Sequence, residues 1–435
     1  MSLTTPDRIR TLQKKLYLKA KAEPEFRFYQ LYDKVWREDI LAHAYALARA
    51  NGGAPGVDGV TFGEIETEGR EEWLSGLREE LRGKAYRPQA VRRVMIPKPN
   101  GGERPLGIPT IRDRVVQTAV KIVIEPVFEA DLDPNAYGYR PARSATDAIR
   151  EVHKALCDGH TDVVDADLSK YFDTIPHDAL MQCVARRIVD RTILSLIKMW
   201  LKAPVEERDG DGGRRMTGGK GSKHGTPQGG VISPLLANIY MNRFLRYWRT
   251  TERTKAFCAR VVSYADDFVI LSRGRAAEAL EWTRGVMARL GLTLNEAKTS
   301  LRDARKERFD FLGYTFGPHR RRNGGWRYLG ASPSRKSVQR MKDKVGALLQ
   351  PRELGPWPAV RDRLNDGLRG WKGYFRHGSL LAAYTAIDRH VLDRVRAFLT
   401  RRHKVPGRGT RQFSSRVVFR ELGVMRLTAP RRRGS

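Results

Sequence analysis

The chain has 435 residues, with 81 Lys and Arg against 49 Asp and Glu, so its formal net charge is +32. A chain this long can bury a substantial core and divide into two or three domains. So large a positive excess repels itself unless a polyanion offsets it, which favours nucleic acid as a partner over a merely soluble basic surface. No apolar stretch is long enough to span a membrane, and residues 1–21 lack the apolar centre of a signal peptide. We therefore expect no membrane partner and a cytoplasmic location.

The N-terminal part is predicted to be helical. Apolar residues recur among charged ones at three-to-four-residue spacings through the first fifty residues. The Gly- and Pro-rich residues 51–56 then break this pattern, and a second charged helix is expected at about residues 64–82. Short β-type runs follow, because residues 91–96 alternate apolar and basic side chains and residues 97–102 supply turn chemistry. This pattern predicts a hairpin with Lys98 near its tip.

The central part reads as strands and helices in alternation. Residues 161–166 form a strand-like run that ends in carboxylates, and Pro176 then opens a helix. Residues 206–225 are rich in Gly and charge and almost devoid of apolar side chains, which indicates an exposed loop or hairpin. Residues 235–248 return to helix, with large apolar side chains at four-residue spacing.

The last elements are a hairpin and a helical region. Residues 261–264 and 268–271 are apolar strands around Ala265-Asp266-Asp267, which predicts a tight hairpin with acids at its turn. A domain boundary is expected near residues 317–325, where glycines and basic residues interrupt the pattern. Beyond it we expect mostly helix, ending in a strongly basic segment.

Asp167, Asp266 and Asp267 suggest phosphoryl transfer from a nucleoside triphosphate. That reaction uses two cations about 3.5 to 4 Å apart, one at the attacking 3′ oxygen and one at the leaving pyrophosphate. A carboxylate at one strand's end, facing a carboxylate pair at a hairpin turn, would supply the oxygens that Mg²⁺ prefers. Tyr264-Ala-Asp-Asp267 alone is weak evidence because Asp is common in turns. The nearby Asp165 and Asp173 leave open a merely solvated acidic cluster.

Eight short blocks follow one another along the chain: Gly56-Val-Asp-Gly59, Arg104-Pro-Leu-Gly-Ile-Pro109, Tyr137-Gly-Tyr-Arg-Pro141, Asp167-Leu-Ser-Lys-Tyr-Phe-Asp173, Thr226-Pro-Gln-Gly-Gly-Val-Ile-Ser-Pro234, Tyr264-Ala-Asp-Asp267, Gly291-Leu-Thr-Leu-Asn-Glu-Ala-Lys298 and Phe311-Leu-Gly-Tyr314. In this order they resemble the reverse-transcriptase core of proteins encoded by bacterial group II introns. Downstream, Leu368-Arg-Gly-Trp-Lys-Gly-Tyr-Phe-Arg-His377 and the run through Arg401-Arg-His403 look like that family's maturase segment. The resemblance covers most of the chain.

The resemblance implies an α+β fold, a right-hand polymerase with fingers, palm and a helical thumb or maturase (X) domain. Residues 1–85 would be an N-terminal extension and the start of the fingers, and residues 86–317 the rest of the fingers and the palm. Residues 326–403 would form the thumb or maturase domain. Residues 404–435 would be a basic segment that binds RNA or DNA.

The resemblance also implies roles for individual residues. Asp167, Asp266 and Asp267 would be the catalytic ligands of two Mg²⁺ ions. Contacts with the dNTP or the template would come from four further residues, Lys98, Arg104, Phe172 and Gln228. The Phe172 ring would exclude a 2′ hydroxyl, and the two cations would offset phosphate charge. The alternatives are a palm-core aromatic for Phe172, a capping side chain for Gln228 and solvated surface charges for Lys98 and Arg104.

A general acid and an RNA surface complete the expected site. Lys298 is the candidate acid that protonates pyrophosphate, although a plain helix-surface lysine fits as well. The predicted RNA-binding cations are Arg369, Lys372, Arg376, Arg401 and Arg402. Trp371, Tyr374 and Phe375 alternate with three of them and would either stack on bases or form the core of a small helical domain.

The expected function is that of an RNA-directed DNA polymerase which binds a group II intron RNA in a ribonucleoprotein, assists its splicing and copies it into cDNA during retrohoming. Its partners would include dNTPs and a target DNA, with nucleoid association when bound to DNA, and a homodimer is left open. A host-adopted relative in phage defence or DNA repair is the main alternative, and an RNA-binding splicing factor with an idle polymerase is another. Because no Cys and His set is spaced for a zinc-supported endonuclease, we expect priming from an existing DNA end.

Overall fold

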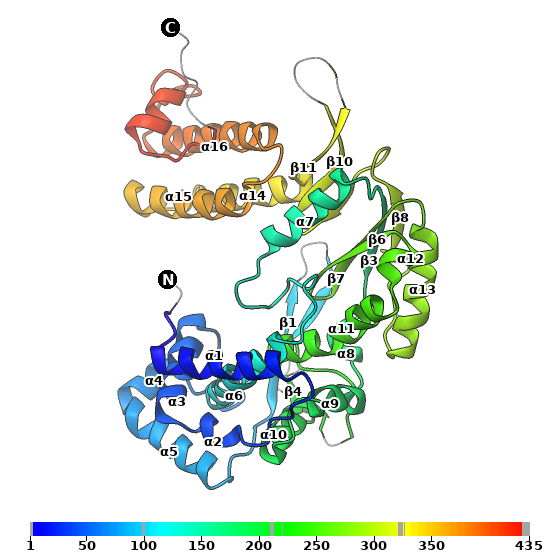
Figure 1. Cartoon of the computed structure of the whole chain (residues 1–435). Coiled ribbons are helices and arrows are strands. Elements are labelled where there is room, and N and C mark those ends of the chain that lie inside the picture. The colour runs from blue at the N-terminus through cyan, green and yellow to red at the C-terminus, as the bar shows by residue number, and fades with distance from the viewer. Residues whose placement is uncertain are drawn as a thin grey trace.

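The computed structural model describes residues 3–97, 101–208, 213–219, 221–320, 325 and 327–428. Lys98 and parts of the predicted 206–225 loop therefore lie outside the described residues. The fold is α+β, as predicted. Helices from the two ends of the chain lie at opposite sides of the molecule, and the strands of the middle part connect them (Figure 1).

The N-terminal helices pack around one long, largely buried helix, α6 (Ile111–Glu129). The charged helix predicted at residues 64–82 is two helices, because Gly69 between them has φ +118°. Thr61 and Glu64 close a reciprocal capping box that starts the first of the two. The helices are α1 (Asp7–Ala22), α2 (Tyr32–Val35), α3 (Glu38–Asn51), α4 (Phe62–Glu68) and α5 (Arg70–Arg82).

A four-stranded sheet of order β2-β1-β4-β5 lies next to these helices. The predicted hairpin is present, with β1 (Val91–Pro97) antiparallel to β2 (Glu103–Ile108). Within the 206–225 region, β4 (Pro204–Arg208) and β5 (Arg214–Gly218) pair as a second hairpin, and β4 runs parallel to β1. The hairpin alternative for this region is thus the one observed.

The palm sheet has the order β6-β7-β3-β8. Successive residues of its strands point to opposite faces of the sheet. Val164 and Ile270 belong to the large core that includes α6, whereas Val163 and Val269 belong to the core shared with the sheet of β9, β10 and β11. The strands are β3 (Asp162–Asp167), β6 (Ala259–Tyr264), β7 (Asp267–Ser272) and β8 (Ser300–Asp303). The palm helices are α7 (Ala145–Cys157), α8 (Tyr171–Thr174), α9 (His177–Ala185), α10 (Arg191–Leu201), α11 (Ser233–Thr250), α12 (Arg253–Ala256) and α13 (Ala276–Arg289).

The helical C-terminal part begins later than expected. Around residues 317–325, where we expected a boundary followed by helix, β10 (Tyr314–Arg320) and β11 (Arg327–Pro333) pair as antiparallel strands, and β9 (Phe309–Phe311) pairs with the other edge of β10. Residues 321–324 of the expected boundary lie outside the described residues. The elements that follow are α14 (Arg335–Leu348), α15 (Trp357–Tyr374), α16 (Leu381–Arg402) and a π-helical turn (Val417–Glu421).

The aromatic residues of the maturase-like block join the palm to the C-terminal helices. Phe375 is buried, and its ring centroid lies 4.5 Å from that of Trp371. The Tyr374 hydroxyl donates a hydrogen bond of 2.8 Å to the Leu312 carbonyl. These contacts favour the core alternative for these rings over base stacking. In the part of the chain that the structure describes, no helix has the length and apolar character needed to cross a membrane.

Candidate active site

The three predicted catalytic aspartates meet at one end of the palm sheet. Asp167, the last residue of β3, lies directly opposite Asp267, the first residue of β7. Asp266 occupies the turn between β6 and β7, which is made tight by Ala265 with φ +59°. The structure therefore places the carboxylates as the sequence predicted, while their catalytic role stays a prediction.

The negative charges of this cluster act on one another. Asp267 keeps solvent contact, but surrounding protein atoms exclude part of its hydration, and this desolvation, followed by the charges of Asp266 and Asp167, raises its pKa to about 7. Desolvation and the charge of Asp167 also raise the pKa of Asp266. The main opposing charge is Lys298, whose Nζ lies 2.9 Å from Asp167 Oδ2. The cluster thus carries more negative charge than the protein itself neutralises.

A divalent cation fits this donor set by its chemistry. Among the described residues, no three His, Cys, Asp or Glu side chains are already arranged around a common point as a formed metal centre. Asp167 Oδ2 instead accepts hydrogen bonds from Lys298 Nζ and, at 3.2 Å, from Asn295 Nδ2. Carboxylate oxygens are nonetheless the ligands that hard divalent ions prefer, and a positive ion relieves the mutual repulsion of these aspartates.

The carboxylates open into a cleft of about 1170 Å³ between the palm and the β1–β2 hairpin. Besides Asp167 and Asp266, it is lined by four other predicted site residues, which are Arg104, Phe172, Gln228 and Lys298. The structure thus brings together every predicted dNTP- or template-contacting residue that it describes. Tyr139 also lines the cleft, with its ring centroid 6.5 Å from that of Phe172, and sequence reasoning gave it no role.

The Pro-Gln-Gly-Gly turn holds the fingers hairpin against the palm. The Gly107 amide donates a 2.5 Å hydrogen bond to the Gln228 carbonyl, and a Cβ at Gly229 would lie 2.3 Å from the Gly107 carbonyl oxygen. Only glycine allows so close an approach of two backbones. The Gln228 side chain donates a hydrogen bond to Asp173 Oδ2 at 3.2 Å, so Asp173 helps to hold the Gln228 side chain in position in the cleft.

The loop after α6 supports the aspartate turn, and sequence reasoning missed this role. The Tyr137 amide donates to the Ser263 carbonyl at 2.8 Å, and the Ser263 amide donates to the Asn135 carbonyl at 2.9 Å. A Cβ at Gly138 would lie 2.3 Å from the Ala265 amide nitrogen. The loop therefore lies directly against the turn that carries Asp266.

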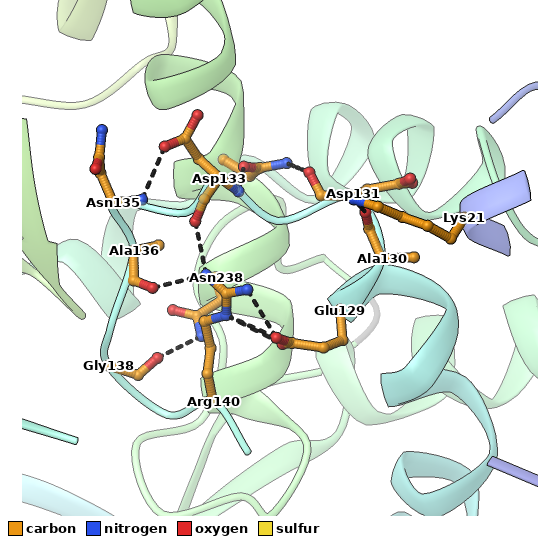
Figure 2. A network of polar contacts seen from close by, with 11 residues as sticks. Lys21, Glu129, Ala130, Asp131, Asp133, Asn135, Ala136, Gly138, Arg140 and Asn238 are labelled. Atoms are coloured by element: carbon orange, nitrogen blue, oxygen red, sulfur yellow. Dashed lines mark hydrogen bonds and ion pairs between the residues drawn. The ribbon is translucent and has the colours of Figure 1, made fainter. Parts of the chain in front are cut away.

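A buried arginine holds this loop in place, as Figure 2 shows. The Arg140 guanidinium donates to the carbonyls of Asp133 at 2.6 Å and Ala136 at 2.7 Å, and it pairs with Glu129 at 2.7 Å. Asn238 of α11 donates to the Gly138 carbonyl at 2.7 Å. The one sequence signal was the Tyr-Gly-Tyr-Arg-Pro block itself, which joins a charged residue to an otherwise uncharged motif.

None of the five predicted RNA-binding cations lines the cleft. Arg369 pairs with Asp366 at 2.5 Å, and Lys372 lies over the Tyr384 ring at 5.9 Å. Arg402 donates to the Gly355 carbonyl at 2.7 Å, so it helps to fix the loop before α15. Arg376 and Arg401 are exposed, and their RNA contacts stay predictions.

Two family models match consecutive parts of the chain. Residues 96–316 match the model described as reverse transcriptase (RNA-dependent DNA polymerase), and residues 338–416 match the group II intron, maturase-specific domain. The first match contains all the described residues of the cleft site named above.

Individual relatives agree with these matches. Protein YkfC of Escherichia coli (strain K12) is 37% identical over 367 residues, which are 76% of this chain and 93% of that protein. Group II intron-encoded protein LtrA of Lactococcus lactis subsp. cremoris is 34% identical over 224 residues, 51% of this chain but only 35% of the relative. Among solved structures, telomerase from Candida albicans aligns with 81% of this chain and 67% of its own at 13% identity and a TM-score of 0.43.

Proposed function

The chain belongs to the reverse transcriptase family and carries a group II intron maturase-specific domain, and we propose that it binds a group II intron RNA, assists its splicing and copies it into cDNA during retrohoming. The observation that carries the polymerase part is the convergence of Asp167, Asp266 and Asp267 at adjoining strand ends. The cleft in front of them is large enough for a nucleotide and a primer end, and it also contains Phe172 and Gln228.

In this proposal, Asp167, Asp266 and Asp267 hold two Mg²⁺ ions. Such ions, when bound, activate the primer 3′ oxygen and offset the charge that develops on the pyrophosphate. Arg104 adds positive charge for the triphosphate, as does Lys98, which lies outside the described residues. The Lys298 ammonium, hydrogen-bonded to Asp167, is the candidate donor of a proton to the departing pyrophosphate.

RNA would also bind to parts of the protein outside the cleft. We propose residues 1–85 as an N-terminal extension with the start of the fingers, 86–317 as fingers and palm, 326–403 as thumb or maturase domain and 404–435 as a basic segment. The exposed Arg376 and Arg401 would contact RNA phosphates together with Lys372 and Arg402, and Arg369, which pairs with Asp366, would contribute less. Target DNA would occupy the cleft as primer, and a homodimer is compatible with this arrangement.

Primer extension and splicing assays test the two halves of the proposal separately. With an RNA template, a DNA primer, dNTPs and Mg²⁺, we expect cDNA, and we expect none when the metal is chelated. With a precursor RNA that contains a group II intron, at a Mg²⁺ concentration too low for self-splicing, we expect spliced product only when protein is added. Extension without splicing would favour the host-adopted role in phage defence or DNA repair, and splicing without extension would remove the polymerase assignment.

Phe172 offers a test of sugar selection. Its ring lines the cleft on α8, and the Thr226 amide fixes its backbone through a 2.7 Å hydrogen bond to its carbonyl. Phe172→Val should make room for a 2′ hydroxyl and raise ribonucleotide use relative to dNTP use by about tenfold or more. Phe172→Tyr, which keeps the ring, is the matched control and should keep the discrimination. A lower melting temperature with unchanged discrimination in Phe172→Val would identify a core aromatic instead.

A further inference from the structure

A cationic hollow lies on the palm outside the polymerase cleft. It has a volume of about 700 Å³, and its lining includes one acid and five cations, namely Glu307 with Arg302, Lys306, Arg308, Arg320 and Arg327. We call the five cations the hairpin cluster, because two of them end β10 and begin β11. None of them lines the active-site cleft, and neither the sequence motifs nor the family models give them a role.

Two arginines of this cluster face each other. Arg320 and Arg327 are direct partners in the antiparallel register of β10 and β11, the last pair before the turn. Like charges directly opposite on neighbouring strands destabilise the pair. In the sequence, residues 321–326 between them include no Asp or Glu. The hairpin thus places like charges together where other residues would form a more stable pair.

Two of the neighbouring cations have an acidic partner, because Arg302 pairs with Glu307 at 3.8 Å and Lys306 with Asp303 at 3.7 Å, whereas Arg308 is held by backbone contacts. Arg308 donates through Nε and Nη2 to the Pro318 carbonyl, at 3.2 and 2.9 Å. Arg302 donates from Nη1 to the Arg308 carbonyl at 3.2 Å. A backbone carbonyl orients a guanidinium but carries no net charge to cancel it. In the described part of the chain, no ion pair is recorded for Arg308, Arg320 or Arg327, whereas nearby Arg305 pairs with Asp303 at 3.0 Å.

The hairpin is tied to the part of the chain that matches the maturase domain. The Tyr328 hydroxyl lies 2.5 Å from Ser379 Oγ, and the Ser379 amide donates to the Ala331 carbonyl at 2.7 Å. In Figure 1, β10 and β11 project beyond the palm beside α7 and the start of the C-terminal helices. A ligand on the hairpin cluster would therefore sit outside the cleft, next to the maturase-like helices.

We propose that the hairpin cluster binds the sugar–phosphate backbone of a structured RNA, at a place separate from the template and primer. Guanidinium groups match phosphate oxygens in pairs, and pre-oriented ones lose less freedom when they bind. A polyanion would also remove the repulsion between Arg320 and Arg327. RNA is favoured over DNA because the hairpin adjoins the maturase-like domain. This inference rests on the proposed RNA-binding function.

Arg320→Gln combined with Arg327→Gln tests the inference. Binding of a transcribed bacterial group II intron RNA should weaken at least about tenfold, and the slope of log affinity against log salt should become shallower by about 1.5, because two phosphate contacts are lost. The melting temperature of the free protein should stay the same or rise, because the facing charges are gone. Extension of a short, unstructured RNA template should stay unchanged, since the hairpin lies outside the cleft.

Arg305→Gln is the matched control. It removes one positive charge from the same region, but Asp303 already neutralises that charge, so RNA affinity should stay close to wild type. Wild-type affinity and salt slope in the double variant would overturn the inference. So would a loss confined to double-stranded DNA of equal length, which would indicate a DNA site. Failure of the wild-type protein itself to bind the intron RNA would instead overturn the proposed function.

Discussion

Replacing Asp266 and Asp267 together by Asn is expected to lower primer extension at least about a thousandfold. The change keeps the shape of both side chains but removes two of the three carboxylates proposed to hold Mg²⁺. A loss of about 4 kcal/mol of transition-state stabilisation corresponds to that factor, and metal ions contribute several kcal/mol to reactions of this kind. RNA binding should persist, because these residues carry negative charge and the proposed RNA contacts are made by cations elsewhere.

Single-turnover extension and thermal unfolding together make this test specific. Desolvation and, after it, repulsion from the neighbouring aspartates already raise the pKa of Asp267 to about 7, so neutral Asn side chains should leave the melting temperature unchanged or raise it. A less active but more stable variant is the outcome expected for a functional cluster. The matched control is Asp165→Asn, on β3, the strand that ends in Asp167, but not in the lining of the cleft, and it should extend at close to the wild-type rate. Wild-type extension by the double variant would end the two-metal proposal.

The parts of the site that could be predicted from the sequence depend on local patterns. The alternation of residues in β1, and the apolar strands on both sides of Asp266 and Asp267, specify hairpins within short windows. Asp167 ends a strand, so its position opposite Asp267 follows once the two strands pair. The ordered blocks then supplied Phe172, Gln228 and Lys298, which line the same cleft.

Contacts between segments that are distant in the sequence could not be predicted from a comparable local pattern. The bonds of Arg140 to Asp133, Ala136 and Glu129 exist only because the chain turns back after α6. In the sequence, Arg140 is one of many arginines. The pairing of β10 with β11, where we expected helix, was not predicted for a related reason. Glycines and basic residues favour an irregular chain whether it links two domains or closes a turn.

Gly138→Ala is expected to reduce primer extension about a hundredfold or more, although it removes no functional group. The added Cβ would lie 2.3 Å from the Ala265 nitrogen and 2.9 Å from the Tyr264 carbonyl carbon. Both are backbone atoms, so no flexible side chain can move aside. The φ of Gly138 lies outside the left-handed region, so alanine is excluded by packing and not by backbone conformation.

Neither side of this contact can give way easily. Hydrogen bonds from Asn238 and Arg140 hold the Gly138 loop on one side. On the other side, the turn is held because β7, which begins at Asp267, pairs with β3 in the sheet. The methyl group must therefore displace Asp266, and a shift of about 1 Å at a reacting centre costs about a hundredfold in rate.

The matched control is Gly76→Ala in α5, where an added Cβ meets no atom within 4 Å. Alanine is the better helix former, so this control should keep full activity and be slightly more stable. Extension rate, melting temperature and RNA affinity would be measured for both variants. If Gly138→Ala unfolds, the effect is global, and Arg140→Lys, which keeps the charge but loses the fork of donors, becomes the informative variant. If Gly138→Ala is folded, binds RNA and extends at the wild-type rate, the turn does not need the support of this loop.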